Sequence, residues 1–154
     1  MREKGGLSLL ITGRGQFRAR LTQVRLHRLR LSAAEDQLSR IAFVAVPADL
    51  ILVSLPIDGR PAPIWGGIRM RAGDILTLGS GERAHARTDG PGHSGSIWSP
   101  SQDLDPYSRA LTGATFAVPS AAMFWRSSPA ASRHLRQLHG AGTRMAAFRA
   151  GKTR

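Results

Sequence analysis

Three polar side chains at alternate positions, Arg83, His85 and Arg87, form the most concentrated candidate binding group in the sequence. Residues 82–88 follow an apolar run at 75–78 and a Gly-Ser-Gly break, a pattern that predicts two strands joined by a turn. Successive residues of a strand point to opposite faces, so the three polar side chains share one face and small alanines the other. We expect the polar face to line a cavity, where the arginines would suit an anionic small molecule.

Two tryptophans of the same β-rich region, Trp65 and Trp98, are expected to supply apolar walls to this cavity. The alternative is that both tryptophans are core residues and that the arginines face water, which is the commoner arrangement for each residue taken singly. The predicted ligand-binding set is therefore His85, Arg83, Arg87, Trp65 and Trp98, with this alternative left open.

Short β-rich runs recur about every ten residues between glycine and proline turns, which is typical of an all-β barrel or sandwich. Residues 41–46 and 50–55 are each closed by a proline, and the short link between them predicts an antiparallel hairpin. The extended pattern at 15–31 slips in phase twice, which favours β-bulges or a strand that changes sheet, with a helix as the alternative. Residues 32–39 are interpreted as a polar connection, and 115–118 as a last strand.

The region from Gly15 to Phe148 resembles the sensor domain of AraC-type transcription regulators. The likeness is carried by 71–87, with its Gly73-Asp74, apolar run, Gly79-Ser80-Gly81 and His85. Further matching pieces are 29–31, 40–47, 52–56, 65–67, 107–113 and 133–139. The resemblance implies a mainly β, cupin-like jelly-roll barrel with one or two C-terminal helices. In that family the helix-turn-helix units that read DNA lie beyond the sensor, and this sequence ends where they would begin.

The expected organisation is a flexible N-terminal segment at 1–14, a cupin-like sensor barrel at 15–120, a C-terminal helix at 128–150 and a basic tail at 151–154. Glycines and charges favour flexibility at the start of the chain. A further helix is expected to begin at 101 or a few residues later and to stop at a glycine.

The C-terminal helix carries a candidate seam for a partner helix. Ser128 and Pro129 favour a helix start there. Residues with the spacing of a packing seam are Leu135, Leu138, Gly142 and Met145. An overlapping stripe consists of His134, Leu138, Ala141, Met145 and Phe148. In AraC-type proteins the helices after the barrel form the dimer contact, so the resemblance implies dimerisation; simple docking on the flank of the barrel is the alternative.

The histidine pattern does not predict a metal centre. Cupin metal sites usually start from a His-x-His pair, and here the second position is Arg87, whose guanidinium is charged and cannot ligate a metal. Glu82 would point away from His85 in a regular strand. We therefore expect no metal, no cofactor and no enzymatic activity, with a cupin-type small-molecule enzyme as the weaker alternative.

The amino-acid composition limits the partners and the cellular location that we expect. The 154 residues include no cysteine, which excludes disulfides and thiolate ligation and fits a cytoplasmic location. No apolar run reaches the roughly 20 residues that span a bilayer, and no signal peptide is recognised, so no membrane association is expected. The net charge of +12 is uneven: residues 1–31 carry +7, residues 32–105 carry −3 and residues 106–154 carry +8.

The function implied by the resemblance is that of an effector-sensing and dimerisation domain of an AraC-type transcription regulator, truncated before its DNA-binding part. Expected partners are a small-molecule effector and a second copy or an intact relative, with DNA bound only weakly and non-specifically. The alternative is a basic nucleic-acid-binding protein that uses its two positive ends. Such a protein would lose affinity steeply as salt rises.

Overall fold

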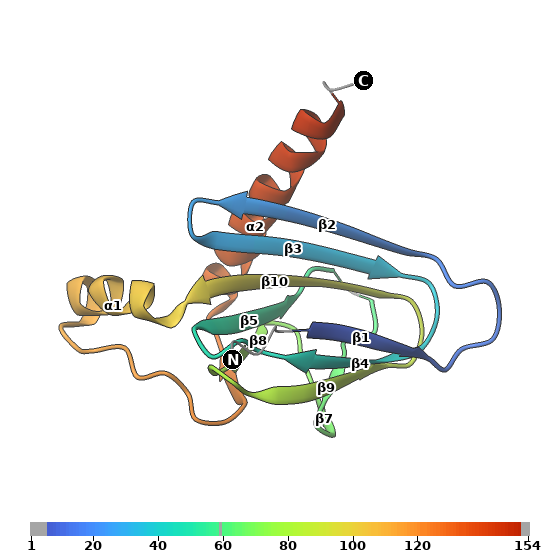
Figure 1. Cartoon of the computed structure of the whole chain (residues 1–154), viewed down its shortest axis with the longest axis horizontal. Helices are drawn as coiled ribbons and strands as arrows, with labels where there is room; N and C mark the ends of the chain where they lie inside the picture. Colours follow the sequence, from blue (N-terminus) through green and yellow to red (C-terminus); the bar gives the residue numbers. More distant parts are fainter. Residues whose placement is uncertain (1–5, 59, 152–154) are drawn as a thin grey trace.

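Two antiparallel β-sheets face one another, and two helices lie outside them, in the computed structural model, which describes residues 6–58 and 60–151 (Figure 1). Sheet A has the order β1 (Gly6–Ile11), β4 (Arg40–Ala45), β9 (Arg83–Thr88), β6 (Ile64–Trp65), β7 (Ile68–Arg69). Sheet B has the order β11 (Met123–Arg126), β8 (Asp74–Leu78), β5 (Leu50–Pro56), β10 (Gly92–Pro100), β3 (Leu29–Asp36), β2 (Ala19–Leu26). The expectation of a mainly β chain is confirmed.

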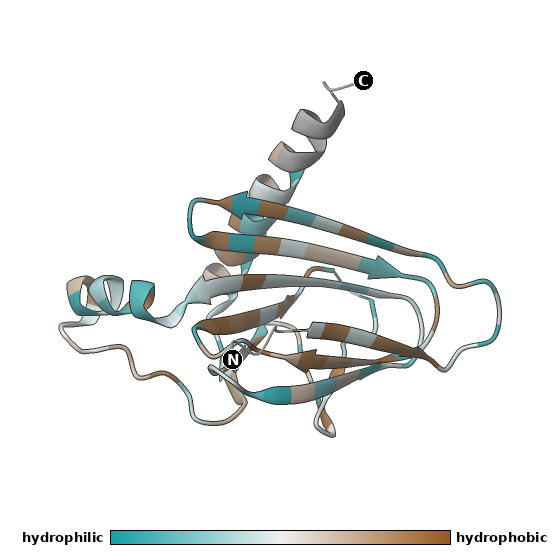
Figure 2. Cartoon of the chain, in the orientation of Figure 1, coloured by the Kyte–Doolittle hydropathy of each residue, from teal (hydrophilic) through white to brown (hydrophobic). Residues whose placement is uncertain are grey.

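The hydrophobic core lies between the two sheets, and several of its residues also line the cavity described below. Sheet B contributes Leu52, Leu76 and Leu78, and sheet A contributes Val44 and Trp65, all of them buried. Figure 2 shows the hydrophobic residues that run along β4 and β5, the central strands of this part of the molecule. Because strand side chains alternate between faces, each sheet presents one apolar face to the other.

The sheets do not close into the expected barrel. β1 and β2 are the outermost strands of sheets A and B, and no strand ladder of the described residues joins them. The chain passes between them through residues 12–18, where the Gln37 amide donates to the Arg18 carbonyl at 3.3 Å. The expectation of a closed barrel is therefore wrong, because two edge strands are left apart on this side; the jelly-roll topology stays a prediction.

The predicted hairpin of 41–46 and 50–55 is also wrong, because the two strands belong to different sheets. β4 pairs with β1 and β9, whereas β5 pairs with β8 and β10. The link between them is a corner in which the Leu50 amide donates to the Pro47 carbonyl at 3.1 Å. A short proline-containing link is equally suited to a hairpin and to a corner between sheets, and the pairing partners decide which one forms.

The N-terminal third forms more strand than expected. Residues 6–11 of the segment expected to be flexible pair with β4 along their whole length. The second phase slip is a tight hairpin between β2 and β3, in which His27 has a φ of +55°. β3 continues to Asp36, through most of the supposed polar connection. The predicted strand at 115–118 is absent, and β11 pairs with β8 instead.

The helices are close to those expected. A short 3-10 turn, η1 (Ser101–Asp103), leads into α1 (Leu104–Thr112), which stops at Gly113 in a left-handed conformation. α2 (Pro129–Gly151) begins after Ser128, whose hydroxyl accepts a hydrogen bond from the Ala131 amide at 3.2 Å. Apart from Gly151, where α2 ends, the predicted basic tail lies outside the described residues.

Neither α1 nor α2 is long and apolar enough to cross a membrane, and these are the α-helices of the described residues.

Candidate functional site

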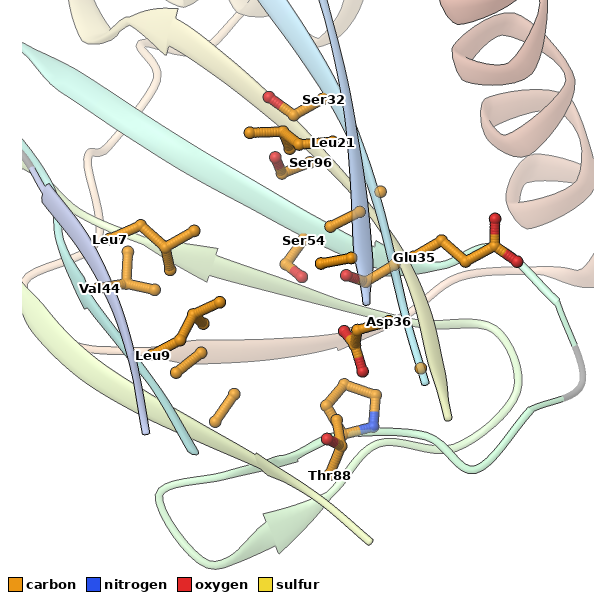
Figure 3. A pocket seen from close by; sticks show the side chains of 18 of the residues that line it. Leu7, Leu9, Leu21, Ser32, Glu35, Asp36, Val44, Ser54, Thr88 and Ser96 are labelled. Carbon is orange, nitrogen blue, oxygen red and sulfur yellow. The ribbon is translucent and has the colours of Figure 1, made fainter. Parts of the chain in front are cut away.

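A cavity of about 350 Å³ lies between the sheets on the side where β1 and β2 diverge (Figure 3). Leu7 and Leu9 of β1 and Leu21 of β2 line it, although they are 57%, 42% and 54% exposed. Large apolar side chains that both line a cavity and meet solvent mark its mouth. The volume falls within the range of small-molecule sites.

The wall formed by sheet B carries a row of hydroxyl groups. Ser32 of β3 is opposite Ser96 of β10, and Ser96 is opposite Ser54 of β5, so the three serines stand in register on adjacent strands. All three line the cavity, and we call them the serine row. Gln23 of β2 extends the row because it is paired with Ser32.

The wall formed by sheet A is apolar. Leu7 is opposite Val44, Leu9 is opposite Ala42, and Ala42 is opposite Ala86 on the next strand. All five residues line the cavity. In Figure 3 the side chains of Leu7, Leu9 and Val44 lie across the cavity from the serine row. A molecule between the sheets would therefore meet hydrocarbon on one side and hydroxyl groups on the other.

One end of the cavity is closed by a buried ion pair. Arg40 Nε donates to Asp36 Oδ2 at 2.6 Å, and the two residues are 7% and 3% exposed. This pair ties the end of β3 in sheet B to the start of β4 in sheet A. Thr88 of β9 is opposite Arg40, so its hydroxyl belongs to the same end. Asp36 accepts with one oxygen only, which leaves Oδ1 for another donor.

The buried polar atoms without a partner are concentrated at this cavity. Among the described residues they are Arg30 Nε, Ser32 Oγ, Asp36 Oδ1, Trp65 Nε1 and Thr88 Oγ1. Every one of these residues lines the cavity. A buried polar group without a partner costs roughly 1–3 kcal/mol, and native proteins keep few of them. Five such atoms around one cavity take their partners from outside the chain, either water or a bound molecule.

The predicted binding residues separate into two groups. Trp65 and Trp98 line the cavity, but Trp65 also belongs to the hydrophobic core and Trp98 packs against it, in agreement with the alternative interpretation. The Arg30 guanidinium lies 5.0 Å from the ring of Trp98. Arg83, His85 and Arg87 are exposed on the outer face of β9 and do not line it.

The polar face of β9 was expected to point into the cavity. In the structure it points outward instead. The alternation itself is as predicted, but Ala86 and Thr88 occupy the inner face. Ala86 and Thr88 line the cavity beside Ala42, whereas arginines at these inner positions would lose their hydration. Outside, Arg87 Nε lies 3.1 Å from Asp89 Oδ1, and the His85 ring lies 6.3 Å from the exposed Phe43 ring.

Several cavity residues escaped the sequence reasoning. Ser32, Asp36 and Arg40 were assigned to a polar connection or its border, because serines and charged residues at 32–40 do not look like an inward-facing strand. The available signal was the alternation of Arg30, Ser32, Ala34 and Asp36, all of which line the cavity.

An ion-pair network stands beside the cavity at the end of β3. Arg60 joins Glu35 (2.8 Å) to Asp58 (3.3 Å), and His93 Nδ1 lies 2.8 Å from Asp58 Oδ2. The hydrogen bond and the charge of Arg60 lower the pKa of Glu35. Burial raises the pKa of Asp58, but hydrogen bonds from the Arg60 amide and from His93 outweigh it, so this pKa is also lowered. The network therefore holds best when both carboxyls are ionised.

Acidification is expected to release this network. A carboxyl whose pKa is lowered by folding adds stability above its unfolded pKa of about 4, and the stability is lost as the pH falls through the lower folded value. The Arg60 amide donates to Asp58 Oδ1 at 3.0 Å and so reports on the network. Its hydrogen-exchange protection should persist at pH 6 and fall steeply below about pH 4. The Leu50 amide, bonded to a carbonyl, is the control; equal pH dependence of both amides would contradict the expectation.

α2 is held on the outer face of sheet B by a buried histidine. His139 is 2% exposed, and its Nε2 lies 2.9 Å from the Ser32 carbonyl oxygen. Because a carbonyl only accepts, the Nε2 atom carries the proton and donates. The ring lies against Gly95 of β10, where a Cβ atom would be 2.8 Å from His139 Cε1. Ser32 thus contacts α2 with its backbone and the cavity with its hydroxyl.

The residues of the predicted dimer seam lie on different faces of α2. Gly142 is buried against Leu31 of β3, and Leu135 is half-buried. Leu138 and Met145 are 61% and 56% exposed on the outer side. Docking on the sheet, the alternative interpretation, therefore accounts for Gly142, and dimer contact by Leu138 and Met145 stays a prediction.

Comparison with protein-family models, with curated proteins and with solved structures finds no match. The resemblance to AraC-type sensor domains stays a prediction. The part of the chain that the structure describes holds no group of three or more histidine, aspartate or glutamate side chains placed to bind a metal ion.

Proposed function

We propose that this chain is a small-molecule-binding domain whose ligand occupies the cavity between the two sheets. The observation that carries the proposal is the gathering of five buried, unpartnered polar atoms around that cavity. Structural cores satisfy such groups internally, whereas binding sites keep a few precisely placed ones for the ligand. Trp65 and Trp98 supply the aromatic surface that such sites commonly use.

The finer proposal is that binding serves sensing, as in AraC-type regulators, with a cupin-like sensor domain that dimerises through α2. The support is the sequence resemblance together with the two contacts of Ser32. A ligand that bonds to Ser32 Oγ acts on the residue whose carbonyl holds His139 of α2. A ligand in the cavity would change how often α2 occupies each of its positions. The shift is limited by how much more tightly the ligand binds the protein with α2 in one position than in the other. Leu138 and Met145 offer the outward surface to a second copy.

Blocking the cavity tests the proposal. The substitution Ala42→Phe places a ring between the sheets at a residue that is 5% exposed. The probe is the neutral dye N-phenyl-1-naphthylamine, followed by fluorescence titration. We expect the parent chain to bind the dye and Ala42→Phe to bind it at least about tenfold more weakly, since about 1.4 kcal/mol of lost binding energy is tenfold in affinity.

The matched control is Ala45→Phe, which adds the same ring to the opposite face of β4 and should leave dye affinity unchanged. Because a large residue in a packed site can unfold a protein, the urea unfolding midpoints of the parent chain and the variants are compared. Ser96→Leu, at a half-buried position, serves as a second blocking variant. Parent-like dye affinity in a folded blocking variant would refute the proposal, and so would absence of dye binding by the parent chain.

A further inference from the structure

We infer that the ligand is an uncharged amphipathic alcohol, with at least two hydroxyl groups bound at the Asp36 end of the cavity and an apolar body that extends to the leucine-lined mouth. This inference rests on the proposed binding function and adds the chemical class of the ligand. It replaces the anionic ligand expected from Arg83 and Arg87, because those side chains lie outside the cavity.

The unpartnered atoms require a group that both donates and accepts. Asp36 Oδ1 can only accept, and Trp65 Nε1 and Arg30 Nε can only donate. The hydroxyls of Ser32 and Thr88 do either. A carboxylate would satisfy the donors and repel Asp36, and an ammonium group would do the reverse. A hydroxyl group provides one donor and two acceptor lone pairs, so hydroxyl groups at the Asp36 end can bond to both Asp36 Oδ1 and the Thr88 hydroxyl. Ser32 and Arg30 lie four and six residues from Asp36 along β3, roughly 13 and 20 Å away, and would meet another part of the ligand.

The two carboxylates at the Asp36 end of the cavity already have positively charged partners within the protein. Asp36 is paired with Arg40 at 2.6 Å and Glu35 with Arg60 at 2.8 Å. An ionic ligand head would lose its hydration between these pairs without a free counter-charge, which is costly in a buried site. Two arginines that line the cavity depart from this rule: Arg30, whose guanidinium is stacked on Trp98, and the exposed Arg20, which is opposite Glu35 on β3. The anionic probe below tests their influence.

The two walls and the mouth of the cavity define the rest of the ligand. The three hydroxyls of the serine row stand on adjacent strands, so the row spans roughly 10 Å at about 4.8 Å per strand. Opposite it lie Leu7, Leu9 and Val44, which offer only hydrocarbon. With Leu21 exposed at the mouth as well, burial of an apolar body there would stabilise the complex by about 25 cal/mol for each Å² removed from water.

Three probes with the same eight-carbon chain separate the possible head groups. They are 1,2-octanediol, octanoate and octylamine, each titrated against the dye-loaded protein at pH 7. We expect the diol to displace the dye at a concentration at least about tenfold lower than either ion. Equal or better displacement by octanoate or octylamine would overturn the inference.

Two substitutions test where in the cavity the diol binds. Thr88→Val removes an unpartnered hydroxyl at the Asp36 end and should weaken diol binding about fivefold, the equivalent of roughly 1 kcal/mol for one hydrogen bond. Ser32→Ala removes an unpartnered hydroxyl roughly 13 Å farther along β3, beyond the reach of the diol head, and should change diol binding little. Octanoate displacement should change little. The control Ser8→Ala removes an exposed hydroxyl from β1 outside the cavity and should change neither. Unchanged diol binding in Thr88→Val would contradict the inference.

The outcomes distinguish this inference from the function on which it rests. Dye binding that Ala42→Phe abolishes, combined with preferential displacement by an ion, would leave the cavity as a binding site and reject the alcohol. Absence of dye binding by the parent chain would reject both. Should Thr88→Val unfold, Thr88→Ala removes the same hydroxyl and is read by the same displacement assay.

Discussion

Substitution of Asp36 with alanine is expected to lower the free energy of unfolding by about 3–5 kcal/mol, the usual cost of leaving one member of a buried ion pair alone. Arg40 is 7% exposed, and its Nε donates to Asp36 Oδ2 at 2.6 Å. Without the carboxylate the guanidinium would remain charged at a buried position with its ion-pair partner removed. The pair also joins β3 to β4, so its loss would loosen the end of the cavity. Urea unfolding followed by tryptophan fluorescence measures the change.

The double variant Asp36→Leu with Arg40→Met separates this charge effect from simple loss of packing. Replacement of both partners by apolar residues of similar size is often neutral or stabilising, so the double variant should recover most of the stability that Asp36→Ala loses. It should also bind 1,2-octanediol poorly, because Asp36 Oδ1 is gone. A double variant as unstable as Asp36→Ala would show that the pair contributes through its shape and not through charge compensation.

Local patterns gave the positions of many strands but not their partners. The runs at 75–78 and 82–88 correspond to β8 and β9, and the serine–proline helix start at Ser128 is observed. The link after residue 46 was misinterpreted because a corner between sheets and a hairpin use the same turn residues. Pairing depends on contacts between distant segments, such as β4 with β1 and β5 with β10, and these leave no trace within a short window of sequence.

The orientation of a strand could not be predicted from alternation alone. In β9 the polar and small residues alternate as expected, but alternation does not say which face is inside. The inner face carries Ala86, opposite Ala42 in the wall of the cavity, and the arginines keep their hydration on the outer face. In β3 the inward residues include Ser32 and Asp36, which violate the rule that polar residues face water. Local exceptions to folding rules tend to be functional sites, which is why the cavity was the part of the molecule that sequence patterns hid.

Substitution of Gly95 with alanine is expected to detach α2 from sheet B at a cost of roughly 2–4 kcal/mol, from overpacking of about 1–3 kcal/mol and a lost hydrogen bond of about 1 kcal/mol. The new Cβ would lie 2.8 Å from Cε1 and 3.0 Å from Nε2 of His139, too close for either atom. The ring would have to leave its buried position, and the Ser32 carbonyl would lose its donor. Hydrogen exchange of the α2 amides, compared with those of β5, measures the detachment.

A double-mutant cycle with His139→Ala decides whether the contact between these two residues is the cause. His139→Ala alone removes the ring and its hydrogen bond, and it opens space at position 95. If the clash with the ring explains Gly95→Ala, the double variant should be no less stable than His139→Ala alone, so the two costs should fail to add by about 2–4 kcal/mol, the full cost of Gly95→Ala. Additive costs would mean that alanine at position 95 acts on β10 itself. The same cycle, repeated with saturating N-phenyl-1-naphthylamine, tests the sensing proposal: a ligand that acts through Ser32 should change α2 exchange in the parent chain and lose that effect once His139 is removed.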